Sequence, residues 1–260
     1  MKRAYLSAIL GMYLLILLTV FVVIRWNKII HLFNHKAYTV VIDAGHGGFD
    51  PGKIGINRAL EKDVNLSVAT KLKHLLEEND IHVIMTREED KGLASKLATS
   101  LMYNNEKQRT ASLMFNKKQL DMRKRISIIN SSNASIAVSI HQNSFVEESS
   151  WGAQVFYYHN SGEGKILAET LQERMKKTLG DGNHRLAKAN SSYYLLKNSN
   201  CPLVIVECGF LSNWKEAELL CDDAYQDKLA WAIHLGILEY LNQSENNDKI
   251  GVAGEKLWIP

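Results

Sequence analysis

The chain has 260 residues, of which 46% are hydrophobic and 23% are charged. This length suits one large domain with appendages, and it can bury a substantial core. The formal net charge of +3 gives no reason to expect a nucleic-acid partner, and the three cysteines, an odd number without C-x-x-C spacing, exclude a disulfide framework.

The first predicted element is a membrane anchor over residues 1–26. Lys2 and Arg3 precede an apolar run from residue 4 to residue 24, which is long enough to cross the hydrocarbon core of a bilayer as a helix. A cleaved signal peptide has a shorter core and a small-residue cleavage site, and this run shows neither feature. The pattern therefore favours a retained anchor. Positive charges on both sides of the run leave its orientation open.

Residues 27–37 form a short spacer, and residues 38–242 are predicted to be a single domain in which strands alternate with helices. Short apolar runs predict the strands, and apolar side chains at helical spacing predict the helices. The expected strands cover residues 38–43, 81–85, 136–140, 154–158, 193–196 and 203–207. The expected helices cover residues 61–78, 121–130, 163–179 and 225–241. This alternation predicts an α/β fold with a mainly parallel, mixed central sheet and helices on both faces.

Two segments do not follow this alternation. Residues 91–120 are predicted to be a basic insertion, and from residue 91 to residue 125 there are nine Lys or Arg and two Asp or Glu. This run is either a solvated helical face or a surface for anionic polymers or lipid headgroups. Residues 243–260 form a polar tail that we expect to be poorly ordered.

Three of the predicted strands lead into a chemically active side chain, and one predicted helix begins with one. His46 follows the first strand in a glycine-rich loop, and Glu61 opens the helix after that loop. His141 and Glu207 stand at the ends of two later strands. Ligands of open α/β sheets bind beyond the carboxyl ends of the strands, so we expect these side chains to lie close together.

These residue types are suited to one zinc ion and one general base. Catalytic zinc sites take three His or Glu ligands and leave a position for water, and His46, Glu61 and His141 supply that set. A carboxylate that is not a ligand must still move protons, and Glu207 is the candidate. Asp43 either holds a ligand histidine in place or caps the loop. From the residues alone, two interpretations remain open. The four side chains either form the site of a metal hydrolase or have unrelated structural roles.

Four segments resemble the signature blocks of the zinc-dependent N-acetylmuramoyl-L-alanine amidases, the Amidase_3 family. They are residues 41–48 (VIDAGHGG), 61–66 (EKDVNL), 139–143 (SIHQN) and 207–213 (ECGFLSN). They occur in the order of the family, and the likeness covers residues 39–241. Ala44 stands where the family commonly has proline, which changes the stiffness of the loop and no ligand.

The resemblance implies roles for the four residues. His46, Glu61 and His141 would bind zinc, and Glu207 would be the catalytic carboxylate. The reaction implied is hydrolysis of the amide between the lactyl group of muramic acid and the L-alanine of the stem peptide in peptidoglycan. Two alternatives remain, namely a zinc peptidase that cuts within the stem peptide and a non-catalytic, anchored peptidoglycan-binding protein.

Within the family, the likeness is closest to the sporulation and germination amidases. It rests on residues 85–88 (MTRE), residues 151–158 (WGAQVFYY), the lone anchor and the lack of wall-binding repeats. It implies removal of stem peptides from spore-cortex peptidoglycan, so that a deacetylase can form muramic-δ-lactam. It also implies an extracytoplasmic catalytic domain that faces the cell wall or cortex. An accessory lipoprotein is a further expected partner, and the basic insertion is where its surface would be sought.

Overall fold

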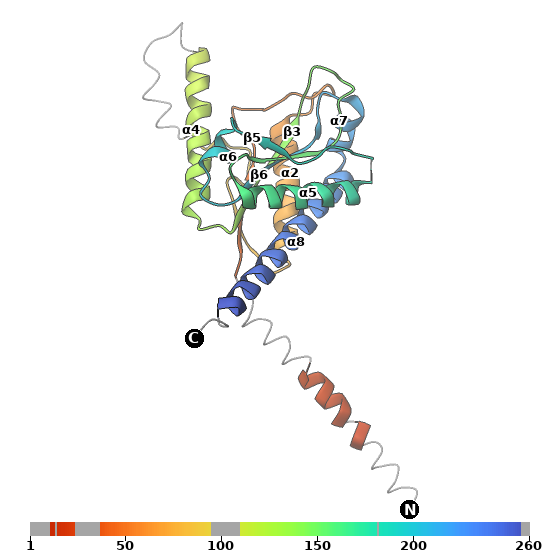
Figure 1. Cartoon of the computed structure of the whole chain (residues 1–260). Helices are drawn as coiled ribbons and strands as arrows, with labels where there is room; N and C mark the ends of the chain where they lie inside the picture. The colour runs from red at the N-terminus through yellow and green to blue at the C-terminus, as the bar shows by residue number, and fades with distance from the viewer. Residues whose placement is uncertain (1–10, 14, 24–36, 95–109, 181, 256–260) are drawn as a thin grey trace, which may run out of the picture. The chain divides into compact units, whose positions relative to one another are not determined.

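The protein is described by a computed structural model, shown in Figure 1. The residues that the structure describes are 11–13, 15–23, 37–94, 110–180 and 182–255. The chain divides into two compact units, Met1–Ala37 and Tyr38–Pro260. Of the first unit, the described residues up to residue 23 are helical. Among all described residues, no helix combines the length and the apolar character needed to cross a bilayer. Much of the predicted anchor and nearly all of the predicted spacer lie outside the described residues.

The second unit is built on one mixed sheet of six strands in the order β2-β1-β3-β6-β4-β5. The strands are β1 (Thr39–Ala44), β2 (His82–Met85), β3 (Ile136–Asn143), β4 (Gln154–Tyr158), β5 (Lys188–Asn190) and β6 (Leu203–Phe210). All neighbours are parallel except β4 and β6, which pair antiparallel. The central strands are nearly continuous apolar runs, as expected for strands covered on both faces. The predicted α/β fold is confirmed.

Helices cover both faces of the sheet. They are α2 (Glu61–Glu77), α4 (Thr110–Ser131), α5 (Gly162–Leu179), α6 (Tyr194–Asn198), α7 (Trp214–Cys221) and α8 (Asp223–Glu255). Helices α2, α5 and α8 pack on one face, where Val40 and Ile42 of β1 join the larger core. Helices α4 and α6 pack on the other face, where Val41 joins a smaller core. Because successive side chains of a strand alternate, each central strand contributes to both cores.

The expectation of a strand over residues 193–196 is wrong. Residues 193–196 were expected to form a strand but lie at the start of α6. The Asn190 side chain accepts hydrogen bonds from the backbone N–H groups of Ser192 and Tyr193, each 2.8 Å long, and so turns the chain directly after β5. Leu195 and Leu196 then enter the smaller core from a short helix. A short apolar run alone does not separate these two outcomes.

The ends of α4 and α8 also differ from the expectation. Helix α8 continues to Glu255, so the described part of the predicted polar tail is helical, and no proline stands between Pro202 and Pro260 to stop it. Helix α4 begins at Thr110, inside the predicted basic insertion. The middle of that insertion, residues 95–109, lies outside the described residues. Two short elements, β5 and α7, were not expected.

Candidate metal centre

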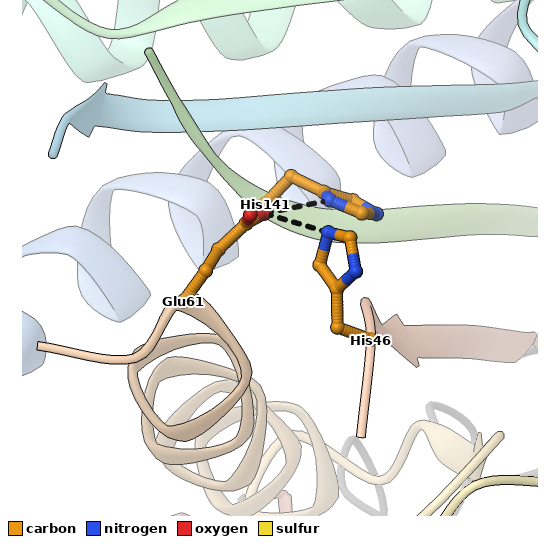
Figure 2. Close-up of side chains that lie close together, drawn as sticks. All are labelled: His46, Glu61 and His141. Atoms are coloured by element: carbon orange, nitrogen blue, oxygen red, sulfur yellow. Dashed lines mark hydrogen bonds and ion pairs between the residues drawn. The ribbon is translucent and has the colours of Figure 1, made fainter. Parts of the chain in front are cut away.

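The sheet brings the predicted site residues together at the carboxyl ends of its central strands. His46 follows β1, while His141 of β3 and Glu207 of β6 are direct register partners. Because β1, β3 and β6 are consecutive neighbours, their ends meet at one edge. Glu61 is the first residue of α2, and its carboxylate faces the two histidine rings (Figure 2). The expected proximity of these residues is confirmed.

His46, Glu61 and His141 form a group that could hold one metal ion. One potential ligand atom from each residue lies within 4.8 Å of the others. The Oε1 atom of Glu61 is 2.9 Å from Nδ1 of His141 and 3.1 Å from Nε2 of His46. The two imidazole rings are 4.9 Å apart between centroids and meet at 77°, so both present an edge to the carboxylate. Two nitrogens and one oxygen in this arrangement suit zinc.

The backbone of the loop is shaped to bring these side chains close. His46 itself has a φ of 60°, in the left-handed region that non-glycine residues rarely adopt. A Cβ atom added to Gly45 would lie 2.3 Å from the ring of His141. One added to Gly52 would lie 2.5 Å from Oε2 of Glu61, and Gly52 also has a φ of 70°. Gly45 and Gly52 are therefore required by the approach of the site residues.

Hydrogen bonding within the site shifts the pKa values of Glu61 and His46 in opposite directions. Burial alone would raise the pKa of Glu61, but hydrogen bonds from His141 and His46 hold it well below its usual range. Burial alone would lower the pKa of His46, but hydrogen bonds to Asp50 and Glu61 raise it to about 9. Metal ligation requires neutral imidazole, so a metal ion and the extra proton on His46 compete for the same site.

Glu207 stands beside this group in a different environment. Its Oε2 atom is buried and has no hydrogen-bond partner within the described part of the chain. Burial raises the pKa of Glu207 to about 7, which His141 opposes and Glu61 reinforces. A carboxyl group with that pKa can both accept and donate a proton near neutral pH. The geometry thus separates one strongly paired carboxylate from one that is free for proton transfer.

A cavity of about 320 Å³ opens onto these residues between α4 and α6. Its walls combine the polar end of the sheet with an apolar rim that includes tyrosines at the start of α6. The lining residues are Asp43, His46, Asp50, Lys118, Asp121, Met122, Arg125, His141, Tyr193, Tyr194, Leu195, Ile205 and Glu207. A substrate that enters here would reach both the histidines and Glu207.

Two buried arginines hold the loop that carries His46. Arg87 donates to the carbonyl oxygens of Ala44 (2.9 Å) and Gly45 (3.0 Å). Arg125, which reaches the loop from α4, donates to the carbonyl oxygens of Ala44 (2.7 Å) and His46. Each arginine is 1% exposed. Their guanidinium groups satisfy consecutive carbonyls at the end of β1 and so fix the backbone from which the imidazole projects.

Asp43 is part of this support. Within the described residues its carboxylate makes no hydrogen bond to a histidine, so the first of the two roles expected from the sequence is wrong. Its carboxylate lies 2.6 Å from Nη1 of Arg125 and accepts hydrogen bonds from the hydroxyl groups of Thr86 (2.7 Å) and Ser139 (2.5 Å). A fully buried carboxylate needs such partners to stay charged. Asp43 therefore anchors Arg125.

Three residues that shape the site are not predicted from the sequence: Asp50, Arg87 and Arg125. The Oδ2 atom of Asp50 is 2.9 Å from Nδ1 of His46, and both residues belong to one glycine-rich loop, so their proximity was a usable signal. Arg87 lies in the segment 85–88, but nothing in the sequence of that segment predicts its contacts with the loop. Arg125 is hidden in a run of basic residues.

Comparison with known proteins shows the family. A family model described as N-acetylmuramoyl-L-alanine amidase matches residues 40–239. The chain belongs to this family, Amidase_3. It is 38% identical over 204 residues to the germination-specific N-acetylmuramoyl-L-alanine amidase of Bacillus subtilis, a match that covers 78% of this chain and 80% of the relative.

Solved structures agree with this assignment. The CwlD amidase from Clostridioides difficile, in complex with the GerS lipoprotein, is 41% identical with a TM-score of 0.71, over 79% of this chain and 98% of that chain. Another N-acetylmuramoyl-L-alanine amidase, from Clostridium difficile 630, is 31% identical with a TM-score of 0.65, over 80% of this chain and 98% of that one. The chain is therefore an amidase, and the expected likeness to the germination amidases is confirmed.

The acid sensitivity of the fold tests the pairing of Asp43 with Arg125. Burial opposes ionisation of Asp43, but Arg125 and the hydroxyl hydrogen bonds lower its pKa from 3.8 to about 2. Because the unfolded chain then binds the proton more tightly, this carboxylate stabilises the fold fully above about pH 4 and ceases to do so as the pH falls through about 2. We expect about 2 kcal/mol of unfolding free energy to depend on it.

Urea unfolding of the wild type and of Asp43→Asn measures the contribution of this carboxylate to the free energy of unfolding. The wild type should be the more stable protein near neutral pH, and the difference should narrow at about pH 3. A difference that stays constant over this range would contradict the assignment.

Proposed function

We propose that this chain is a zinc-dependent amidase that hydrolyses the bond between N-acetylmuramic acid and L-alanine in peptidoglycan. The observation that carries the proposal is the meeting of His46, Glu61 and His141 within 4.8 Å, next to a buried carboxylate oxygen of Glu207 that has no hydrogen-bond partner in the described part of the chain. Membership of the amidase family supports the identity of the bond. We assign the activity to a catalytic domain over residues 38–242.

Zinc fits the donor set, since two imidazoles and one carboxylate leave a coordination position for water. When bound, zinc would act as a Lewis acid on the amide carbonyl and would acidify water at neutral pH. His46, Glu61 and His141 would hold it. The arginine-braced loop keeps the His46 ring in place, so little reorganisation is needed on binding.

Glu207 would move the protons. It would accept a proton from the attacking water, whose oxygen adds to the carbonyl carbon of the lactyl group. It would then donate that proton to the nitrogen of L-alanine as the C–N bond breaks. The products are a lactyl carboxylate on the glycan and a stem peptide with a free amino terminus. The raised pKa of Glu207 suits both transfers.

The substrate that we propose is spore-cortex peptidoglycan. The likeness to a germination-specific amidase supports this choice. Removal of the stem peptide would leave muramic acid ready for a deacetylase to form muramic-δ-lactam. Peptidoglycan lies outside the cytoplasm, so the catalytic domain would be extracytoplasmic, with residues 1–26 as its membrane anchor and residues 27–37 as a spacer.

We also propose an accessory lipoprotein as a partner. The support is that a relative with 41% identity was solved in complex with the GerS lipoprotein. The basic insertion over residues 91–120, part of which forms the start of α4, is the segment to examine for this contact.

The role of Glu207 predicts a specific loss of activity. Glu207→Gln should lower kcat by about 10²- to 10⁴-fold, because the amide cannot take up the proton. Its zinc content should remain that of the wild type. Muropeptide analysis checks the reaction at the same time, since free stem peptides that begin with L-alanine indicate an amidase. Shortened stems that are still attached to muramic acid would indicate a peptidase, and full activity of the variant would remove Glu207 from the mechanism.

The metal site predicts a pattern of zinc loss. His46→Ala and His141→Ala should each lower the zinc content of the purified chain, because two ligands hold the ion less firmly than three. His184→Ala is the matched control, since His184 is exposed and lies outside the group. Elemental analysis gives the zinc content, and chelation should abolish an activity that added zinc restores. Stoichiometric zinc in both ligand variants would disprove the site.

The proposed anchor predicts where the protein is found in the cell. Deletion of residues 1–26 should move the protein from the membrane fraction to the soluble fraction, because it removes the apolar run. Immunoblots of the two fractions measure the change. An intact chain that already fractionates as soluble would contradict the anchor.

The proposed partner predicts complex formation with a lipoprotein. The purified chain should co-elute with the GerS lipoprotein of Clostridioides difficile in size-exclusion chromatography, and an unrelated lipoprotein should not co-elute. Zinc measured in the chain with and without the lipoprotein would show whether the partner alters metal binding. Separate elution at micromolar concentrations would argue against this partner.

A further inference from the structure

A chain of polar contacts joins helix α4 to the metal centre. The Nζ atom of Lys118 lies 2.8 Å from Oδ1 of Asp50. The other oxygen of Asp50, Oδ2, lies 2.9 Å from Nδ1 of His46. The Nε2 atom of the same ring is 3.1 Å from Oε1 of Glu61. Each carboxylate oxygen of Asp50 thus has its own cationic or imidazole partner.

The loop holds Asp50 firmly at the base of this chain. Its backbone N–H and carbonyl pair with the carbonyl and N–H of Gly47, at 3.2 and 3.0 Å. Its Oδ1 atom also accepts a hydrogen bond from the backbone N–H of Gly52, at 3.3 Å. The Asp50 side chain is only 17% exposed, whereas that of Lys118 is 54% exposed. The carboxylate is therefore fixed by the loop and oriented from outside by one lysine.

We propose that Asp50 orients His46 for metal binding and that Lys118 of α4 sets the position of Asp50. This inference rests on the proposed metal site. A carboxylate that accepts a hydrogen bond from the Nδ1–H group of an imidazole leaves Nε2 as the ligand atom and fixes the plane of the ring. Lys118, by engaging Oδ1, keeps Oδ2 directed at the ring. Both are positioning residues, and neither belongs to the group of three that would hold the metal.

This arrangement gives α4 an influence on metal affinity. Helix α4 already holds the backbone of the loop through Arg125, which donates to the carbonyl oxygen of His46. Lys118 acts separately on the side chain of His46, because it binds Asp50, which in turn binds the imidazole ring. The two contacts act on different parts of His46, so the contribution of Lys118 can be removed while Arg125 is kept.

Zinc affinity of the purified full-length chain, measured by competition with a chromogenic chelator, tests the inference. Asp50→Ala should weaken zinc binding by about 10- to 100-fold, as loss of a partner that orients a ligand histidine does elsewhere. Lys118→Ala should weaken it by about two- to fivefold, the effect of a partly exposed ion pair. Lys118→Arg should restore most of that loss. Lys124→Ala, which removes an equal charge from an exposed position of α4, should have no effect.

A double-mutant cycle separates positioning from general effects of charge. If Lys118 acts through Asp50, Lys118→Ala should cause no further loss in the Asp50→Ala background. An equal loss in both backgrounds, or an equal loss from Lys124→Ala, would overturn the role of Lys118. Unchanged zinc affinity of Asp50→Ala would overturn the role of Asp50.

Separate control measurements test whether each variant folds and whether the wild type binds zinc. Thermal unfolding of each zinc-free variant shows whether it is folded, and Asp50→Asn serves as a second variant of similar shape if Asp50→Ala does not fold. Asp50→Asn should also weaken zinc binding, because a neutral amide orients the imidazole less strongly than a carboxylate does. Absence of zinc binding by the wild type would overturn the proposed metal site itself and this inference with it.

Discussion

The carbonyl oxygens at the carboxyl end of β1 impose the constraint on which the site depends. The chain leaves the sheet there in a tight loop, and these oxygens accept hydrogen bonds from side chains instead of a neighbouring strand. A buried carbonyl without a partner costs roughly 1–3 kcal/mol. Arg87 and Arg125 remove that cost, and they reach the loop from different elements, since Arg87 follows β2 and Arg125 belongs to α4. The position of His46 is therefore decided by residues distant from it in sequence.

Arg87 also connects this loop to the helix that supplies the carboxylate of the candidate metal centre. The same guanidinium that binds the end of β1 donates to the carbonyl oxygen of Lys62, at 2.7 Å, in the first turn of α2. Glu61 directly precedes that residue. Two of the three potential ligands thus belong to segments held by one buried cation. Movement of α2 relative to β1 would have to break these bonds, so the distance between the ligands is protected by the fold.

The site also places two neighbouring carboxylates in different environments. Glu61 is paired with two imidazoles and has a pKa well below the usual range, whereas the pKa of Glu207 is raised to about 7. Such a separation of pKa values between nearby acids is typical of catalytic sites that need both a fixed charge and a mobile proton. Here, the difference comes from hydrogen bonds to Glu61 on one side and from burial of Glu207 on the other, whose Oε2 atom has no hydrogen-bond partner among the described residues. It follows from which strand or helix each residue occupies.

The sequence was sufficient to predict five of the six strands and the meeting of His46, Glu61, His141 and Glu207. Apolar strand runs and the geometry of open α/β sheets determine both, and they depend only on local pattern and strand order. The supporting residues depend on contacts across the fold, which no local pattern reveals. In the sequence, Arg125 is one of several basic residues that would be expected at the surface. Its burial becomes apparent only when α4 packs on the sheet. The strand predicted over residues 193–196 is wrong for a related reason, because core packing and the turn at Asn190 determine the conformation of this segment.

The direct pairing of His141 with Glu207 also determines how such a protein can diverge. Side chains on a strand alternate between faces, so a slip of β6 by one residue would turn Glu207 away from the cavity and bring Val206 or Cys208 to its place. Insertions and deletions inside the central strands would therefore abolish the site at once. Changes in loop length at the opposite edge of the sheet would leave it intact. Related proteins should accordingly differ in the lengths of their connections and conserve the lengths of β3 and β6.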